Sequence, residues 1–203
     1  MRRIRAQLFA AVDGVVEAPD QWHFPYFDDA MGSAVEATLG RADTLLLGRR
    51  TYDSFAGAWP GREAAGEADA PFAKRLGDAR KIVVSRSPLT FEWRGSEQLA
   101  GDLVEGAARL KEEPGGDVWI SGSVSVVRQL IAAGLLDELN LFVHPIAVGR
   151  GMRLFEETGT AVPLELRSAE TFPSGVLNLF YAPAAAPAAA GYEEARTHLS
   201  QED

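Results

Sequence analysis

Three short turns in the chain place guanidinium and hydroxyl groups directly after apolar runs. A guanidinium binds phosphate oxygens through two parallel hydrogen bonds, a hydroxyl adds a further donor, and a glycine lets the backbone approach closely. Such turns predict a site for an anionic, phosphorylated ligand. Their residues are Gly48-Arg49-Arg50-Thr51, Ser85-Arg86-Ser87 and Ser121-Gly122-Ser123-Val124-Ser125.

Each turn taken alone has a simpler explanation. Arginines after a strand are usually just solvated, and Ser121-Gly122-Ser123 could be a pair of helix N-caps. The three turns together are more informative, and they suit a phosphorylated dinucleotide, most simply NADPH. The sequence contains neither a G-x-G-x-x-G fingerprint nor a Walker lysine motif. We therefore expect neither a Rossmann domain nor a P-loop NTPase.

The apolar runs before these turns predict the strands that position them. Residues 42–48, 80–84 and 118–120 are short apolar segments, typical of strands buried on both faces, and residues 4–16 contain a first central strand. In an open α/β sheet, ligands bind at the carboxyl ends of parallel strands, where helix N-termini add unpaired N–H groups. Strands of this kind would bring the three turns to one pocket.

The second half of the chain has the clearest order of elements. A strand at 118–120, a helix over 125–133 and a strand over 138–143 predict a βαβ unit with parallel strands and a right-handed crossover. Residues 164–183 predict a terminal β-hairpin. An earlier helix is expected over residues 28–39.

Composition narrows the function classes. Of the 203 residues, 46% are hydrophobic and 24% charged, as in a globular domain, and the net charge of −9 argues against broad binding of nucleic acid. The absence of cysteine excludes disulfides, thiolate metal ligands and cysteine nucleophiles, and we predict no metal site. The basic start resembles a signal peptide, but Asp13 interrupts an apolar run too short for a membrane span. We expect a cytoplasmic protein with no membrane partner.

Several long motifs resemble the dihydrofolate-reductase-like superfamily, in the branch of the riboflavin-biosynthesis reductase C-terminal domain and its stand-alone relatives. The resemblance covers about residues 2–183. It rests on "VDG" after the first strand, "LLLGRRTYDSF", "KIVVSRS" and "VWISGSVSVVRQLIAAGLLDELNLFVHPIAVGRGMRLF". It implies a three-layer αβα sandwich with a mixed, mainly parallel sheet, NADPH as hydride donor, and frequent homodimers. The segment "LNLFVHPIAV" is a candidate dimer interface.

The resemblance also implies roles for the turns. Arg49, Arg50 and Thr51 would meet the 2′-phosphate and pyrophosphate of NADPH, and Ser85 and Arg86 the adenosine ribose-phosphate. The turn 121–125 would cover the pyrophosphate, with Gly48 preceding the arginines. Main-chain groups of residues 9–11, including Ala10 and Ala11, would lie near the nicotinamide carboxamide. The family turn usually has two adjacent glycines, whereas Ser121 stands first here, and its side chain could narrow the approach of the pyrophosphate.

Three side chains are candidates for the chemistry at the substrate. In dihydrofolate reductases a carboxylate entering the first helix anchors the pterin, and Asp28 is the nearest match, although it could simply be a helix-start charge. Asp13 could face the pocket or make an Asp-Gly turn. His23 could donate a proton to an imine or merely pack at the surface. The aromatic candidates for stacking on a flat substrate, which could equally be core, are Trp22, Phe24, Phe27 and Trp59.

The sequence predicts a reductase domain at 1–183 and, at 184–203, an Ala/Pro linker followed by a short polar helix over 191–200. The expected activity is NADPH-dependent hydride transfer to a small heterocyclic or imine substrate, pterin-like or pyrimidine-like. Two alternatives stay open. One is reduction of the ribosylaminopyrimidine of the riboflavin pathway, and the other is a non-catalytic nucleotide-binding protein on the same fold.

Overall fold

A computed structural model describes residues 1–155, 161–188, 191, 192 and 196. Its strands are β1 (Ile4–Ala11), β2 (Ala42–Gly48), β3 (Arg80–Val84), β4 (Ser96–Gln98), β5 (Asp117–Ile120), β6 (Glu138–His144), β7 (Leu164–Thr171) and β8 (Leu177–Pro183). Its helices are α1 (Asp29–Leu39), α2 (Arg49–Ala65), α3 (Ala70–Asp78), α4 (Leu103–Glu112) and α5 (Val124–Ala132), with short 3-10 turns η1 (Pro19–Gln21) and η2 (Phe24–Tyr26).

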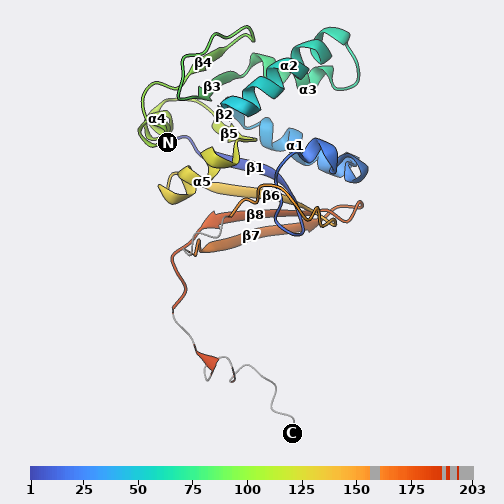
Figure 1. Cartoon of the computed structure of the whole chain (residues 1–203), viewed down its shortest axis with the longest axis vertical. Coiled ribbons are helices and arrows are strands. Elements are labelled where there is room, and N and C mark those ends of the chain that lie inside the picture. Colours follow the sequence, from blue (N-terminus) through green and yellow to red (C-terminus); the bar gives the residue numbers. More distant parts are fainter. Residues whose placement is uncertain (156–160, 189–190, 193–195, 197–203) are drawn as a thin grey trace.

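The strands form one eight-stranded sheet in the order β4-β3-β2-β5-β1-β6-β8-β7, which runs from top to bottom in Figure 1. The pairs from β4 to β6 are parallel, whereas β8 is antiparallel to both β6 and β7. The mixed, mainly parallel sheet and the C-terminal hairpin are therefore confirmed. The connection from β5 through α5 to β6 gives the predicted βαβ unit, although β1 lies between its two strands.

Helices cover both faces of the sheet because its central strands are apolar on both sides. Within β2, Leu46 packs in the core cluster beneath α4 and α5, whereas Leu45 and Leu47 pack in the cluster beneath α2 and α3. All three leucines are fully buried, and each such burial contributes about 1.5–3 kcal/mol. Helix α1 packs through Met31 and Val35 against the second face near β6. The result is the predicted three-layer αβα sandwich.

Local signals fix the ends of α1 as predicted. Asp28 is the N-cap and its side chain accepts the Met31 N–H, and Gly40 is the C-cap. Helix α2 continues through Pro60 to Ala65, although a proline inside a helix removes a backbone hydrogen bond and crowds the preceding turn. The three-residue edge strand β4 was not predicted, since it has no apolar pattern.

The C-terminal tail is described only in part. The hairpin closes the domain, and Figure 1 shows the following linker leading away from it. The helix predicted over 191–200 lies mostly outside the described residues. Within the part of the chain that the structure describes, no helix is both long and apolar enough to cross a membrane.

Candidate active site

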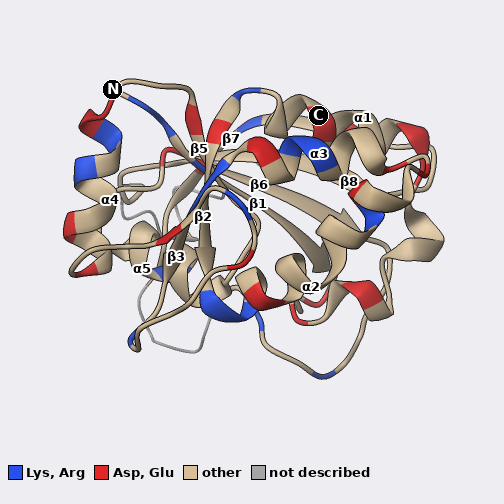
Figure 2. Ribbon diagram, turned by 90° about the horizontal axis from the view of Figure 1, so that it is seen from above, with Lys and Arg blue, Asp and Glu red and all other residues tan. Residues whose placement is uncertain are grey.

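The three donor-rich turns lie at one edge of the sheet. Strands β3, β2 and β5 are parallel neighbours, and Gly48 at the end of β2 is in register with Val84 at the end of β3. The turns that follow these strands therefore emerge side by side. Figure 2, a view from above, shows basic residues at the start of α2, in a chain of net charge −9.

Direct contacts join the turn after β2 to the turn after β5. The Gly48 N–H donates to the Gly122 carbonyl oxygen at 3.2 Å. A Cβ at Gly48 would collide with the Ser123 hydroxyl, and a Cβ at Gly122 would lie 2.6 Å from Thr51 Oγ1. Gly122 also has a φ of 148°, in the region that favours glycine. Both positions thus require glycine for the turns to approach each other.

Arg49 connects these turns to the turn after β3. Its Nη1 donates to Ser87 Oγ at 3.1 Å, and its Nε lies 3.5 Å from Asp53 Oδ2. Ser85 Oγ accepts the Ser87 N–H at 3.2 Å and lies 2.8 Å from the Ser87 carbonyl oxygen, to which it donates. The three turns, far apart in sequence, therefore form one continuous surface.

The donor set of this surface fits a phosphorylated dinucleotide. Arg50 and Arg86 are exposed and have no hydrogen-bond or ion-pair partner among the residues that the structure describes. Helices α2 and α5 both begin here, and neither N-cap, Gly48 or Ser123, makes a side-chain cap hydrogen bond. The first N–H groups of such helices attract anions. Guanidinium groups, hydroxyls and helix N–H groups together match the chemistry of phosphate oxygens.

A cavity of about 220 Å³ opens at the carboxyl ends of β1 and β6. Ala10 and Ala11 of β1, Leu141 and Val143 of β6, and Phe155 contribute to its mostly apolar wall. The Ala10 and Ala11 backbones thus lie beside a space at the edge where a nicotinamide ring is expected.

Asp13 is held in a turn by backbone groups. Its Oδ2 accepts the Gly149 N–H at 2.7 Å, and its carbonyl oxygen accepts Arg153 Nε at 3.0 Å. The hydrogen bond from Gly149 is the main cause of a lowered pKa, so the carboxyl is ionised at neutral pH. Asp13 therefore fastens the loop after β6 to the turn after β1, which is the turn role that the sequence left open.

Asp28 is likewise used in the structure of the fold. One carboxylate oxygen accepts the Met31 N–H at 2.8 Å and the other accepts the Ser174 N–H at 2.9 Å. These bonds, the one from Met31 first, lower its pKa. Asp28 therefore caps α1 and ties it to the β7–β8 hairpin, which agrees with the helix-start interpretation.

His23 lies in a buried cluster of rings. It is 6% exposed and stacks on Phe9 with a centroid distance of 4.5 Å and an interplanar angle of 14°. Burial and, second, the neighbouring His144 lower the pKa of His23 to about 4. The ring is thus neutral at pH 7 and does not act as a proton donor from this position. Trp22 is also buried, and its indole N–H donates to the Glu17 carbonyl oxygen at 3.0 Å.

The remaining aromatic candidates separate into two places. Phe24 and Phe27 lie beside His23 and are 61% and 48% exposed. Trp59 is instead packed between α2 and α3, with its ring 5.2 Å from Phe72 and the Arg62 guanidinium 5.3 Å from its centroid. Trp59 therefore belongs to the core of the α2–α3 pair, and its predicted contact with substrate is not supported.

Sequence reasoning missed the side chain of His144. It is the last residue of β6, and its Nδ1 lies 2.9 Å from the Phe142 carbonyl oxygen and 3.3 Å from that of Ala10. Its ring lies 6.0 Å from His23 and 5.2 Å from Trp22. The two histidines are 121 positions apart, and no local pattern could have paired them.

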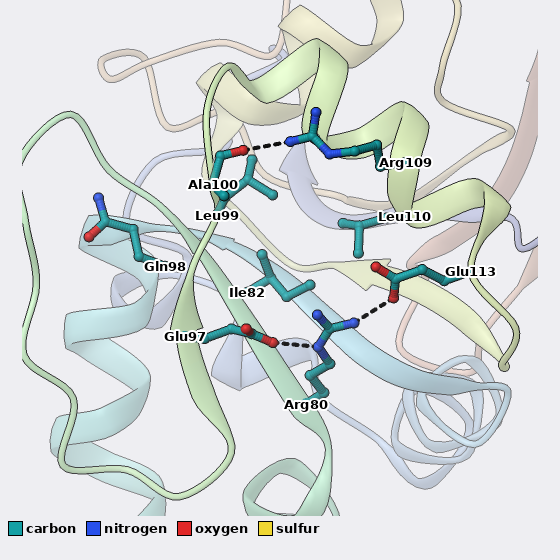
Figure 3. Close-up of a pocket in the computed structure, with 10 residues that line it drawn as sticks. Arg80, Ile82, Glu97, Gln98, Leu99, Ala100, Arg109, Leu110 and Glu113 are labelled. Atoms are coloured by element: carbon teal, nitrogen blue, oxygen red, sulfur yellow. Dashed lines mark hydrogen bonds and ion pairs between the residues drawn. The ribbon is translucent and has the colours of Figure 1, made fainter.

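A second concavity, of about 130 Å³, lies between β3, β4 and α4 (Figure 3). Its charged groups are paired with one another. Arg80 bridges Glu97 at 2.5 Å and Glu113 at 2.6 Å, and Arg109 donates to the Ala100 carbonyl oxygen at 2.7 Å. This pattern is typical of a structural ion-pair network, so the candidate site is the edge formed by the three turns.

A mainly parallel αβα sandwich that carries its polar turns at this edge belongs to the dihydrofolate-reductase-like class. The match to the model of the RibD C-terminal domain spans residues 2–178, and the chain belongs to that family. The resemblance inferred from the motifs is therefore confirmed.

Known proteins agree with this assignment. The chain is 29% identical over 181 residues to the uncharacterized protein YyaP of Bacillus subtilis (strain 168), covering 89% of this chain and 94% of YyaP. A crystal structure of a proposed riboflavin biosynthesis protein from Shewanella sp. PV-4 superposes with a TM-score of 0.71 at 18% identity, covering 90% and 99% of the two chains. A diaminohydroxyphosphoribosylaminopyrimidine deaminase/5-amino-6-(5-phosphoribosylamino)uracil reductase from Thermotoga maritima gives 0.62 at 14%, covering 90% of this chain and 57% of that one. The structural similarities support the fold.

Proposed function

We propose that this protein is an NADPH-dependent oxidoreductase that transfers hydride to a small heterocyclic or imine substrate, pterin-like or pyrimidine-like. The observation that carries the proposal is the convergence of three turns, linked by the hydrogen bonds of Gly48 to Gly122 and of Arg49 to Ser87. Membership of the RibD C-terminal domain family supports a reductase of the riboflavin-pathway type.

The proposal assigns each turn a part of the cofactor. Arg49, Arg50 and Thr51 would bind the 2′-phosphate and pyrophosphate, and Ser85 and Arg86 the ribose-phosphate of adenosine. The turn 121–125, with the start of α5 behind it, would cover the pyrophosphate. The cofactor, when bound, supplies the hydride. The residues of the protein bind it, orient it toward the end of β1 and keep its phosphates in place.

Reduction of a C=N bond also requires one proton. His23 is neutral at pH 7 in its buried position, and Asp13 and Asp28 both have lowered pKa values and are ionised. None of the three is in its acidic, protonated form at neutral pH. We therefore expect the proton to come from solvent rather than from these side chains.

Two other functions have specific support. Reduction of a ribosylaminopyrimidine, the activity in the name of the Thermotoga maritima relative, would use Arg153, which lines the 220 Å³ cavity, and Arg150 for the substrate phosphate. A non-catalytic nucleotide-binding protein would need only the three turns. Tight NADPH binding without NADPH oxidation across a panel of pterins, flavin precursors and imines would favour the second.

We further propose a cytoplasmic homodimer. The segment "LNLFVHPIAV" is not a suitable interface, because β6 is paired on both sides, with β1 and β8. The β7–β8 hairpin is a better candidate, since Leu166 and Leu177 are 51% and 39% exposed there. Sedimentation at several protein concentrations, with Leu166→Glu as the interface variant, tests this.

The proposal is tested by titrating the protein with NADPH and with NADH. Arg50→Ala or Arg86→Ala removes a charged hydrogen-bonding group and should weaken NADPH about 10-fold to 150-fold, corresponding to about 1.5–3 kcal/mol. NADH lacks the 2′-phosphate, to which Arg50 is assigned. The affinity for NADH should therefore fall much less than the affinity for NADPH in Arg50→Ala. Arg62→Ala is the matched control, because Arg62 lies on α2 but pairs with Asp69 at 2.5 Å. Equal losses for both cofactors in both variants would contradict the assignment.

A further inference from the structure

The ring cluster at the end of β1 contains a stacking position filled by the protein itself. Phe9 has Phe142 on one side, at 5.6 Å and 25°, and His23 at 4.5 Å and 14°. Phe24 lies 4.2 Å from His23, beyond the stack. The His23 imidazole is thus a flat ring held near two phenylalanines, as a flat heterocyclic ligand would be held.

His23 is poorly suited to a purely structural role in this position. The residue is buried, yet its Nδ1 has no hydrogen-bond partner in the described part of the chain. An unpaired buried polar atom lowers stability, and an apolar ring of similar size would fill the space without that loss. A group that could exchange with a ligand accounts for the imidazole better than packing does.

The segment that carries His23 is separable from the sheet. We call residues 18–27 the cover segment. Its backbone hydrogen bonds all close within it, from Gln21 to Ala18, from Trp22 and His23 to Pro19, and onward to Phe27. It begins at Ala18, whose φ of 45° is the one positive value at a non-glycine residue in the described chain. The cover segment is therefore held on the sheet by side-chain packing.

The deepest polar group of the cluster requires a donor. His144 is fully buried, and its Nδ1 faces two carbonyl oxygens, so Nδ1 carries the proton. Its Nε2 is then a lone-pair acceptor, and it has no partner among the described residues. A ligand with a ring N–H would satisfy this atom, whereas a ligand lacking donors would not.

We propose that the His23 ring holds the place of a flat heterocyclic substrate on Phe9, and that His144 Nε2 accepts a hydrogen bond from a ring N–H of that substrate. The cover segment moves outward as the substrate enters. This inference rests on the proposed reductase function and specifies its substrate class as planar, neutral rings with an N–H donor.

The first test uses lumazine, a planar pteridinedione with ring N–H groups, as the probe. His23→Ala vacates the stacking position, so lumazine should bind this variant about fivefold to tenfold more tightly than the wild-type protein. Gln21→Ala, an exposed change in the same segment, should leave the affinity unchanged. Equal or weaker binding to His23→Ala, or no lumazine binding to either protein, would overturn the proposal.

The wild-type protein provides a test that needs no folded variant. The imidazole proton signals of His23, shifted by the ring current of Phe9, should move toward free-histidine values as lumazine saturates the protein. Saturation with unchanged His23 signals would show that the ligand binds elsewhere and that the inference is wrong.

The acceptor role is tested with 1,3-dimethyllumazine, which keeps the flat ring but lacks ring N–H groups. His23→Ala should prefer lumazine, and the added substitution His144→Phe should remove that preference. A preference that persists without His144 contradicts the role. NADPH titration of each variant distinguishes failure of this inference from failure of the proposed function. Normal NADPH binding with a failed lumazine test would overturn the inference and leave the proposed function intact.

Discussion

Two regions of the molecule are built in opposite ways. The turn edge is the surface formed by the turns after β2, β3 and β5, and the ring cluster contains Phe9, His23 and His144. At the turn edge, Arg50 and Arg86 are exposed and the backbone is fixed by parallel strands and by contacts such as that of Gly48 with Gly122. In the ring cluster, His23 Nδ1 and His144 Nε2 are buried without hydrogen-bond partners in the described part of the chain. The backbone hydrogen bonds of the cover segment all close within that segment. If the two proposals above hold, the turn edge is a preformed site for the cofactor, and the ring cluster is a substrate site that rearranges on binding.

The largest expected effect comes from disturbing the turn edge. Gly48→Ala places a methyl group against the Ser123 hydroxyl, so we expect the free energy of unfolding to fall by about 2–3 kcal/mol, together with loss of NADPH binding. Urea unfolding and NADPH titration measure the two effects. Gly57→Ala is the control, because a Cβ added at Gly57 would meet no other atom within 4 Å. Gly57 lies inside α2, where alanine should raise the free energy of unfolding by up to about 1 kcal/mol. Unchanged NADPH binding in Gly48→Ala would contradict the proposal that the turn edge is the NADPH site.

A comparable effect is expected in the ring cluster on acidification. Burial lowers the pKa of His23 from 6.5 to about 4, with His144 acting in the same direction and Asp20 opposing it. Below pH 6.5 the unfolded chain gains a proton that the folded chain does not, so stability falls as pH decreases, by on the order of 2–3 kcal/mol by pH 4. Unfolding curves from pH 7.5 to pH 4 check this.

The variant His23→Leu isolates the contribution of His23 to this pH dependence. Leucine cannot titrate, so the variant should lose much of the decline between pH 6.5 and pH 4, while His144, whose pKa burial also lowers, keeps part of it. An unchanged pH profile would show that His23 is not held neutral in the cluster. NADPH affinity at pH 7.5 should remain at the wild-type value.

A smaller effect is expected at the start of α1. Asp28→Ala removes the N-cap of α1 and its bond to Ser174, which should lower the free energy of unfolding by about 1 kcal/mol. NADPH binding should be unchanged, because the groups that Asp28 binds, the N–H groups of Met31 and Ser174, lie outside the three turns. A large loss of turnover with little loss of stability would restore the catalytic interpretation.

The predictable part of the molecule was the part set by strands. Apolar runs such as residues 42–48 mark buried strands, and parallel strands bring the following turns to one edge, so the surface of Arg49, Ser87 and Gly122 followed from the sequence. The exposure of individual side chains and the identity of their hydrogen-bond partners did not follow from the sequence. Trp59 and the aromatic residues of the cover segment are of the same residue class. Only tertiary packing shows that Trp59 belongs to the α2–α3 core and that the others lie in the ring cluster.

The pairing of His23 with His144 was likewise beyond sequence reasoning. It depends on β1 lying beside β6 and on a segment without regular pattern folding back over both strands. The same holds for Asp28, whose bond to Ser174 crosses 146 positions and ties the cap of α1 to the β7–β8 hairpin.

The central claim is that the turns after β2, β3 and β5 bind one molecule of NADPH. A crystal structure of the protein soaked with NADPH tests it most directly. We expect phosphate density between Arg49, Arg50 and the turn 121–125, with the nicotinamide directed toward Ala10. A cofactor bound on another face, or no density at concentrations well above a measured Kd, would contradict it.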